Sequence, residues 1–253
     1  MIQELTVDEL RVRVYENRSD LGGDAANCVA QKINDLLAGQ EFANIIFAAA
    51  PSQNEFLSFL SQHHEIKWNR INAFQMDEYI GLEHDTEQLF QNFLKEKLFD
   101  KIPLHAVHYI DGSAAEPATE CERYASLLNL YPPDITCMGI GVNTHIAFND
   151  PHEANFNDPL KVKLVGLDPV SRQQQVDDGC FDQIDQVPLA AITLTVPALV
   201  QANHIFCIVP GANKAQAVSH TLKSTIGEHY PSTILRKHPG AILFLDRDSS
   251  SKI

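Results

Sequence analysis

Short apolar runs alternate along the chain with stretches that carry apolar residues at helical spacing. The apolar runs predict strands at 44–50, 72–76, 107–110, 134–138, 160–167, 188–196, 204–209 and 241–246. The amphipathic stretches predict helices at 23–38, 86–99, 118–130 and 212–223, with shorter helical runs at 56–60 and 197–202. Such alternation is typical of βαβ units, so we predict an α/β fold with a doubly wound, mostly parallel, Rossmann-like sheet. No repeat or linker interrupts the pattern, which favours a single domain over residues 1–253.

Four segments with polar or glycine residues come directly after predicted strands. They are 50–54, 76–79, 139–150 and 210–214. Ligands of doubly wound sheets bind at the carboxyl ends of the strands, which is where these segments begin. We therefore expect the four segments to meet around one site.

The charge balance is acidic, with 19 basic and 33 acidic residues and a formal net charge of -14. This balance excludes nucleic-acid-binding proteins, which need a basic surface, and it means that any phosphate site is built from local groups. No run of about 18 or more apolar residues occurs, which argues against a membrane protein. Five cysteines without a CxxC pair indicate free thiols in a reducing compartment, so we expect a cytoplasmic protein.

Two strand-to-helix turns are candidate anion sites, because the first N–H groups of a helix have no partner within the helix. In the first turn Ser52 adds a hydroxyl, although Pro51 removes one donor and a plain serine N-cap is the alternative interpretation. In the second turn Gly211 permits a tight bend and Lys214 lies near the helix start. A lysine there opposes the helix dipole unless an anion binds nearby, which favours a functional interpretation.

Two segments carry side chains suited to proton transfer. Asp77 and Glu78 follow a strand and should point to opposite sides, so only one of them is expected to enter the cleft as a general base. A solvated acidic loop is the alternative interpretation. His145 lies in one run with Asn143 and Asp150, and this cluster favours a proton carrier over a structural histidine.

Other chemistries receive little support from the sequence. The histidines at 63, 64, 105 and 108 lack zinc-site spacing and cysteine partners, so no metal site is predicted. No GxSxG motif of a serine hydrolase occurs. Gly139 and Gly141 form GxG without the third glycine, so the fingerprint of a dinucleotide cofactor is incomplete.

Two motifs resemble the signature segments of one enzyme family. Phe74-Gln-Met-Asp-Glu-Tyr-Ile-Gly-Leu82 and Gly139-Ile-Gly-Val-Asn-Thr-His-Ile-Ala-Phe-Asn-Asp-Pro151 are similar to those of the glucosamine-6-phosphate deaminase family. That family shares a superfamily with 6-phosphogluconolactonase. The resemblance implies the fold of a sugar-phosphate isomerase and an aldose–ketose isomerisation coupled to loss of ammonia. It also implies a small phosphosugar as the substrate and no metal or organic cofactor.

The resemblance further implies roles for single residues. Asp77 would take the C2 proton and return it at C1, and His145 would help to open the sugar ring. Asn143 and Asp150 would belong to the same catalytic set. The substrate and its phosphate would be bound by Ala50, Ser52, Gln53, Gly141, Arg172 and Lys214. Arg172 is the least direct of these matches, because the family's phosphate-binding arginine falls near Gly179 in this chain.

The chain departs from the family pattern around the histidine. The family's Asp-Gly pair is Asn143-Thr144 here, and a neutral amide should leave His145 harder to protonate than a carboxylate would. The family's glutamate after this run is Asp150, which is shorter by one methylene. The usual Thr-Gly-Ser phosphate loop is replaced by 50–52, which read Ala-Pro-Ser.

These departures leave three functions open. The first is conversion of glucosamine or galactosamine 6-phosphate to a ketohexose 6-phosphate and ammonia. The second is a 6-phosphogluconolactonase-like hydrolase, although the GHTASLFP-type continuation of that branch is absent at His145. The third is a sugar-phosphate sensor that keeps the pocket and has lost the proton relay. The sequence decides neither the sugar epimer nor whether the chain forms a homo-oligomer.

Overall fold

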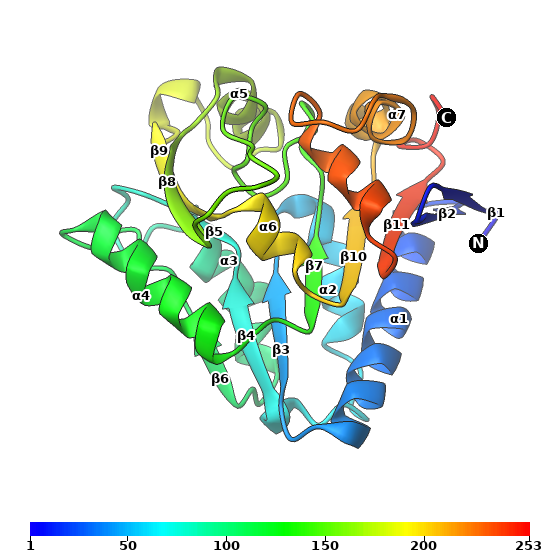
Figure 1. Ribbon diagram of the computed structural model, residues 1–253, viewed down its shortest axis with the longest axis horizontal. Helices are drawn as coiled ribbons and strands as arrows, with labels where there is room; N and C mark the ends of the chain where they lie inside the picture. The colour runs from blue at the N-terminus through cyan, green and yellow to red at the C-terminus, as the bar shows by residue number, and fades with distance from the viewer.

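The chain is organised around an eight-stranded sheet in a computed structural model that describes all 253 residues (Figure 1). Its strands in spatial order are β1 (Gln3–Val7), β2 (Leu10–Tyr15), β11 (Ala241–Asp246), β10 (His204–Val209), β7 (Ile135–Met138), β3 (Ala43–Phe47), β4 (Ile71–Gln75) and β6 (Ala106–His108). Every neighbouring pair is parallel except β1 and β2. A second, antiparallel sheet consists of β5 (Asp77–Tyr79), β9 (Ala190–Leu194) and β8 (Val162–Gly166).

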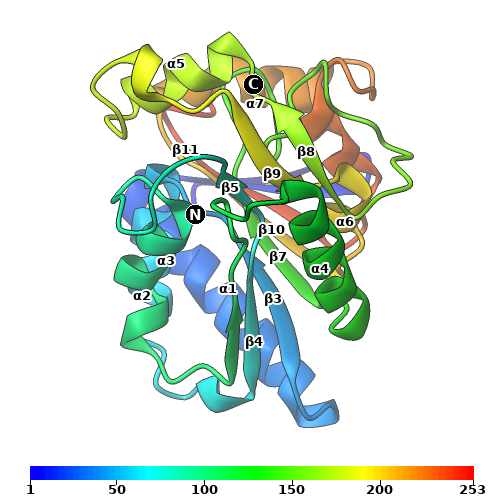
Figure 2. The same ribbon diagram turned by 90° about the vertical axis from the view of Figure 1, so that its left-hand side faces the viewer.

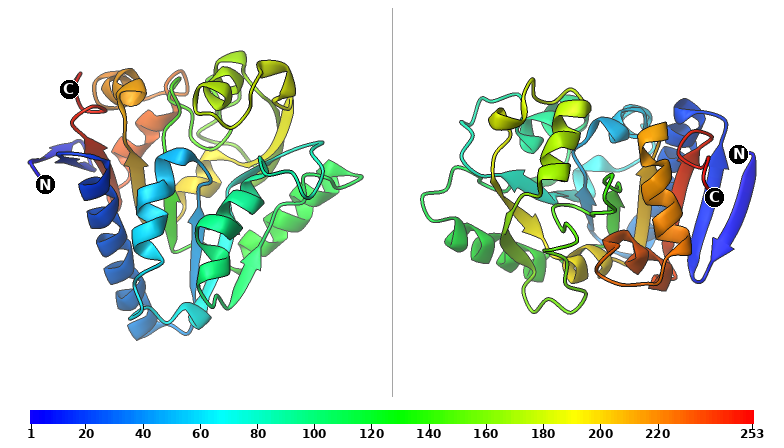
Figure 3. Two further views of the ribbon diagram at one scale, coloured as in Figure 1. Left: turned by 180° about the vertical axis from the view of Figure 1, so that it is seen from behind. Right: turned by 90° about the horizontal axis from the view of Figure 1, so that it is seen from above.

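Helices cover both faces of the large sheet. The α-helices are α1 (Arg18–Gly39), α2 (Asn54–Leu60), α3 (Phe90–Lys97), α4 (Pro117–Leu130), α5 (Pro169–Asp177), α6 (Val196–Val200) and α7 (Ala215–Lys223). The 3-10 helices are η1 (Pro51–Gln53), η2 (Trp68–Arg70), η3 (Phe99–Lys101), η4 (Ile184–Gln186), η5 (Ala212–Lys214) and η6 (Pro231–Lys237). Figure 3 shows α1, α2 and α3 on the face opposite to α4, α6 and α7, so the predicted doubly wound, mostly parallel α/β fold is confirmed.

The apolar core is divided by the large sheet into two clusters. Ile45 and Phe47 belong to a cluster of 37 buried residues that includes α1 and α2, whereas Ile46 belongs to a cluster of 30 with α4 and α7. Neighbouring side chains of a strand point to opposite faces, which explains this division. Both faces of the sheet are thus mainly apolar, as the apolar runs of the sequence indicate.

The first helix is longer than the sequence pattern predicts. It was expected at 23–38, and it begins at Arg18 because the side chain of Asn17 accepts a hydrogen bond from the backbone N–H of Asp20. This N-cap satisfies one of the free donors of the first turn. Its buried residues recur at helical spacing, from Leu21 to Leu37, and they pack on the sheet.

Some elements lie outside the prediction. The hairpin of β1 and β2 was not predicted, and neither was α5. The predicted strands at 160–167 and 188–196 are present as β8 and β9, and they form the small sheet above the carboxyl ends of the large sheet (Figure 2). In that sheet Asp77 of β5 pairs with Thr193 of β9. The small sheet therefore fixes the position of Asp77.

No helix has both the length and the apolar character that crossing a membrane requires.

Close packing holds β5 against the loop that follows β6. Gly112 lies in this loop, and its backbone carbonyl accepts a hydrogen bond from Gly81 N at 3.2 Å. A Cβ atom at Gly112 would lie 1.9 Å from the carbonyl oxygen of Tyr79, the last residue of β5. Only glycine permits this approach of two backbone segments.

We expect Gly112→Ala to lower the free energy of unfolding by about 2 kcal/mol or more, because the backbone of β5 must move away. Urea denaturation would measure the effect. Gly39→Ala is the matched control, since Gly39 ends α1 and a Cβ there meets nothing within 4 Å. That change should leave stability equal or raise it slightly. Equal stabilities of the two variants would contradict the proposed close contact.

Candidate active site

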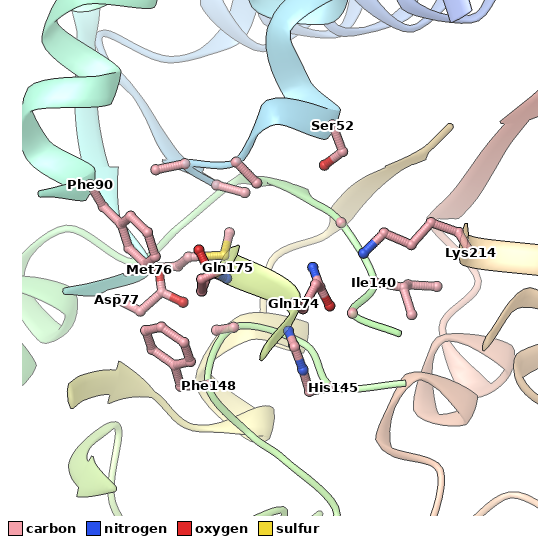
Figure 4. A pocket seen from close by; sticks show the side chains of 16 residues that line it. Ser52, Met76, Asp77, Phe90, Ile140, His145, Phe148, Gln174, Gln175 and Lys214 are labelled. Atoms are coloured by element: carbon pink, nitrogen blue, oxygen red, sulfur yellow. The ribbon is translucent and has the colours of Figure 1, made fainter. Parts of the chain in front are cut away.

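One cavity opens at the carboxyl ends of β3, β4, β7 and β10 (Figure 4). All four segments that the sequence singled out contribute to it. Its lining residues are Ala48, Ala49, Ala50, Ser52, Met76, Asp77, Phe90, Gly139, Ile140, Gly141, His145, Ala147, Phe148, Gln174, Gln175 and Lys214. The prediction that these strand ends meet around one site is confirmed by this arrangement.

The carboxylate of Asp77 is buried in the cavity without a hydrogen-bond partner. Only 6% of the residue is exposed, and Figure 4 shows the rings of Phe90 and Phe148 on the same side of the cavity. These two rings stack with their centroids 5.6 Å apart. Burial, together with the charge of the adjacent Glu78, raises the pKa of Asp77 well above its usual value. A carboxylate in this environment is a stronger base than one in water.

Glu78 points away from the cavity, as the alternation along a strand predicts. Its two oxygens accept hydrogen bonds from Gln75 Nε2 at 2.7 Å and from the backbone N–H groups of Tyr79, Phe90 and Gln91 at 2.9–3.0 Å. Burial raises the pKa of Glu78 to about 7, although these four bonds lower it. Two of the donors belong to the first turn of α3, so Glu78 ties this helix to β5.

Three polar atoms surround one ring nitrogen of His145. Its Nδ1 lies 2.8 Å from Asn143 Oδ1, 2.9 Å from Ser171 Oγ and 3.1 Å from Asp150 Oδ1. Burial alone would raise the pKa of Asp150, but its hydrogen bonds with His145, Ser171 and Asn143 lower that pKa to about 2. The carboxylate is therefore ionised at neutral pH beside the imidazole. In Figure 4 the other ring nitrogen, Nε2, points into the cavity.

Asn143 and Asp150 do not line the cavity, so they would act on a ligand through His145. Gly141 lines the cavity and also lies directly under the imidazole ring. A Cβ at Gly141 would lie 2.1–2.4 Å from Cε1, Nε2 and Nδ1 of His145. Any other residue at this position would displace the ring, which explains the second glycine of the GxG motif.

The cation of the site is Lys214, at the end of η5. It is 5% exposed, and its ammonium group makes no hydrogen bond or ion pair with the protein. Burial lowers the pKa of Lys214 to about 8, while the charge of Asp178 opposes this shift. Figure 4 shows its Nζ pointing into the cavity, with Ser52 on the same wall. A buried cation without a partner is a site for an anion.

The prediction for Gln53 needs adjustment. The residue is fully buried and does not line the cavity. Its amide donates to Ser52 Oγ at 3.0 Å and to the carbonyl oxygen of Ile208 at 3.2 Å. Gln53 therefore positions the Ser52 hydroxyl and does not reach a ligand itself. Ala50 and Ser52, by contrast, both lie in the cavity wall.

The expectation for Arg172 is corrected by the structure. Its guanidinium donates to the carbonyl oxygens of Ile184 and Val187, which connects α5 to η4. It does not line the cavity, so Lys214 is the cationic side chain there. No group of three or more His, Cys, Asp or Glu side chains is arranged to hold a metal ion.

Sequence reasoning missed the contribution of α5. Gln174 and Gln175 line the cavity, and Gln174 Oε1 accepts a hydrogen bond from the backbone N–H of Val142 at 2.9 Å. The buried residues of α5 are Ser171 and Gln174, and both are polar. A helix with a polar buried face gives no apolar periodicity. The three consecutive glutamines were the available signal.

An α/β sheet that brings a buried carboxylate, an imidazole and a buried ammonium group around one cavity is typical of enzymes that act on small anionic molecules. The chain belongs to the family of glucosamine-6-phosphate isomerases and 6-phosphogluconolactonases, whose model matches residues 16–244. The glucosamine-6-phosphate deaminase of Exiguobacterium sp. is 33% identical over 184 residues, which are 73% of this chain and 70% of that protein. The glucosamine-6-phosphate deaminase of Bacillus cereus is 32% identical over 183 residues, or 72% of this chain and 68% of that protein.

Solved structures show the same fold. The structure of a monomeric glucosamine-6-phosphate deaminase has a TM-score of 0.88 at 26% identity, covering 96% of this chain and 99% of that chain. The 6-phosphogluconolactonase from Thermotoga maritima has a TM-score of 0.76 at 20% identity, covering 93% of this chain and 98% of that chain. At this lower identity the likeness to the lactonase concerns the fold alone.

Thr144 adopts a strained conformation next to His145. Its φ is 74°, in the left-handed region that β-branched residues rarely adopt. The residue is 1% exposed, and its Oγ1 has no hydrogen-bond partner. Its backbone is held by Gly141 O, which accepts from Thr144 N, and by Ser232 N, which donates to Thr144 O. Both backbone bonds are independent of the side chain.

We expect Thr144→Gly to raise the free energy of unfolding by about 1 kcal/mol and Tm by about 2–4 °C. The substitution removes the left-handed strain and the buried unpaired hydroxyl, and these gains exceed the entropic cost of glycine. Differential scanning calorimetry would measure the change. Thr119→Gly in the exposed face of α4 is the control, and it should lower Tm. A lower Tm for Thr144→Gly would show that the threonine side chain stabilises the loop.

Proposed function

We propose that this protein converts an amino-sugar 6-phosphate into a ketohexose 6-phosphate and ammonia. Glucosamine 6-phosphate is the first candidate substrate, because the relatives described above carry that name. Galactosamine 6-phosphate is the second, since no contact in the cavity is assigned to the C4 hydroxyl. The observation that carries the proposal is the single cavity that contains Asp77, His145 and Lys214 with their reactive atoms unpaired on the cavity side.

The phosphate end of the substrate would lie at Lys214 and Ser52. The ammonium group supplies the positive charge and the hydroxyl supplies a hydrogen bond, while the overall charge of -14 contributes no attraction. Anchoring the phosphate there places the opposite end of the sugar toward Asp77, across the cavity in Figure 4. Binding energy from the phosphate would thus orient the reacting carbons.

His145 would open the sugar ring through its Nε2. The atoms around Nδ1 accept hydrogen bonds, so Nδ1 carries the hydrogen of the neutral ring and Nε2 has a free lone pair. Nε2 can take the proton of the anomeric hydroxyl and give it to the ring oxygen, which yields the open-chain aldehyde. The ionised Asp150 stabilises the imidazolium that forms in between.

Asp77 would then move a proton between two carbons. Its carboxylate removes the proton from C2 of the open-chain aldehyde, so the C2–H bond breaks and its electrons form the C1–C2 double bond. The former aldehyde oxygen takes a proton from the C2 ammonium group of the substrate, which gives a neutral enolamine. The same proton returns to C1, which converts the C2 amine to an iminium ion. One water molecule adds to C2 and ammonia leaves, giving the ketose phosphate. The raised pKa of Asp77 gives it the basicity for the first step.

The proposal is tested by measuring ammonia and ketose phosphate with glucosamine and galactosamine 6-phosphate. We expect Asp77→Asn to lower kcat by about 1,000-fold or more while substrate binding, measured by calorimetry, changes little. Asp182→Asn, an exposed surface change, should leave kcat unaltered. For the wild type, kcat/KM should fall as the pH is lowered, because the base must be ionised. This fall should occur at a pH above the usual pKa range of an aspartate.

Other outcomes identify the alternatives. Hydrolysis of 6-phosphogluconolactone without ammonia release would replace the proposal by a lactonase activity. Phosphosugar binding by the wild type without any turnover would indicate a sensor. Normal turnover of Asp77→Asn would remove Asp77 from the role of the base.

We expect Lys214→Met to raise KM by about ten- to a hundredfold while kcat changes much less, because Lys214 binds a part of the substrate that does not react. In the wild type KM should rise as the pH passes about 8, since the lysine loses its charge above that pKa. The variant should lack this rise. Lys237→Met removes an exposed lysine and serves as the control. An unchanged KM in Lys214→Met would exclude Lys214 from the phosphate site.

A further inference from the structure

Ser171 connects α5 to the proton relay. It is the third residue of α5, after the N-cap Asp168, and it is 1% exposed. Its hydroxyl donates to Asp150 Oδ1 and lies 2.9 Å from His145 Nδ1. The backbone N–H of Asp168 donates to the other oxygen of Asp150 at 3.3 Å. Val176 of α5 packs against the apolar core, but the two buried residues of the helix, Ser171 and Gln174, are polar. These polar contacts therefore help to dock the helix over the loop of His145.

The direction of the Ser171 hydroxyl proton contributes to the state of the imidazole, together with Asn143 and Asp150. A hydroxyl has one proton, and here it is directed to a carboxylate that can only accept. Ser171 therefore presents a lone pair to His145 Nδ1. Asn143 Oδ1 also presents a lone pair, because it accepts from the backbone N–H of His145 at 3.1 Å while Nδ2 donates to Asp150. An unprotonated Nδ1 would face acceptors only.

We propose that Ser171 is a positioning residue that, together with Asn143 and Asp150, holds His145 in the tautomer with the hydrogen on Nδ1. This tautomer leaves the Nε2 lone pair in the cavity, where ring opening requires it. The hydroxyl also forms a second path between the imidazole and Asp150, beside their direct contact of 3.1 Å. The tautomer is a property of the free protein, and only its catalytic consequence rests on the proposed function.

The same contacts exclude Ser171 as a nucleophile. Serine, histidine and aspartate lie together here, as they do in serine hydrolases. In those enzymes, however, serine and aspartate contact different ring nitrogens. In this protein Ser171 and Asp150 both contact Nδ1, and Ser171 does not line the cavity. The hydroxyl therefore has no access to a substrate carbon.

The test is the ring nitrogen spectrum of His145 in the free protein, with its signals assigned by comparison with His145→Gln. Two-dimensional ¹H–¹⁵N NMR of the neutral ring distinguishes a protonated Nδ1 from an unprotonated one. We expect a protonated Nδ1 in the wild type and a measurable share of the Nε2 tautomer in Ser171→Ala, which loses one of the three acceptors at Nδ1. Ser171→Thr, which keeps the hydroxyl, should restore the wild-type pattern. A hydrogen on Nε2 in the wild type would overturn the proposal without any variant.

The kinetic readout uses the same variants. Ser171→Ala should lower kcat for ammonia release about tenfold and leave KM within about twofold, and Ser171→Thr should recover most of kcat. Ser126→Ala removes an exposed hydroxyl of α4 and serves as the control. Full kcat in Ser171→Ala, or a loss of kcat with an unchanged tautomer, would overturn the positioning role. Ammonia release with the wrong tautomer contradicts this inference alone, and the right tautomer without ammonia release contradicts the proposed function alone.

Discussion

Burial of ionisable groups without protein partners is the constraint on which the site depends. Asp77 is 6% exposed and Lys214 is 5% exposed, and neither side chain has a hydrogen bond or ion pair within the protein. Such burial costs free energy. The stabilisation from the two apolar clusters on the faces of the large sheet must be larger than this cost. The same desolvation raises the pKa of the acid and lowers that of the lysine. Both shifts bring the pKa values closer to neutral pH, so the charge of each group responds to small changes in its surroundings.

The central strands could be predicted from sequence because they are buried on both faces. The apolar runs at 204–209 and 241–246 coincide with β10 and β11. Two elements were missed for different reasons. The buried residues of α5 are Ser171 and Gln174, so tertiary packing decides this helix and hydrophobic periodicity does not report it. In the edge hairpin every residue of β1 is exposed or half-buried, so that strand gives no apolar signal. In β2, by contrast, Leu10-Arg-Val-Arg-Val-Tyr15 alternates between apolar and polar residues, and this strand pattern was missed.

The residues of the candidate site also divide into those that could be predicted from sequence and those that could not. Residues at strand ends could be predicted, since parallel strands deliver their carboxyl ends to one edge, and Asp77, His145, Ser52 and Lys214 do lie together there. Residues that depend on side-chain direction could not. Arg172 donates hydrogen bonds to backbone carbonyls away from the cavity, and the amide of Gln53 donates one to the hydroxyl of Ser52. Ser171 was missed because nothing in the sequence places it beside a loop more than twenty residues earlier.

In the loop around His145, the amide of Asn143 matches the negative charge of Asp150 on one side and the imidazole on the other. Asn143 Nδ2 donates to Asp150 Oδ1 at 2.9 Å, while Asn143 Oδ1 faces the imidazole. A carboxylate at position 143 would place two negative charges at this distance, so one of them would have to protonate or move away. The amide at 143 keeps an acceptor on Nδ1 and leaves one full charge on Asp150, which stays in contact with the ring. The departure from the family pattern therefore keeps acceptors at Nδ1 of His145, and the amide at position 143 does not remove the contact between the imidazole and a carboxylate.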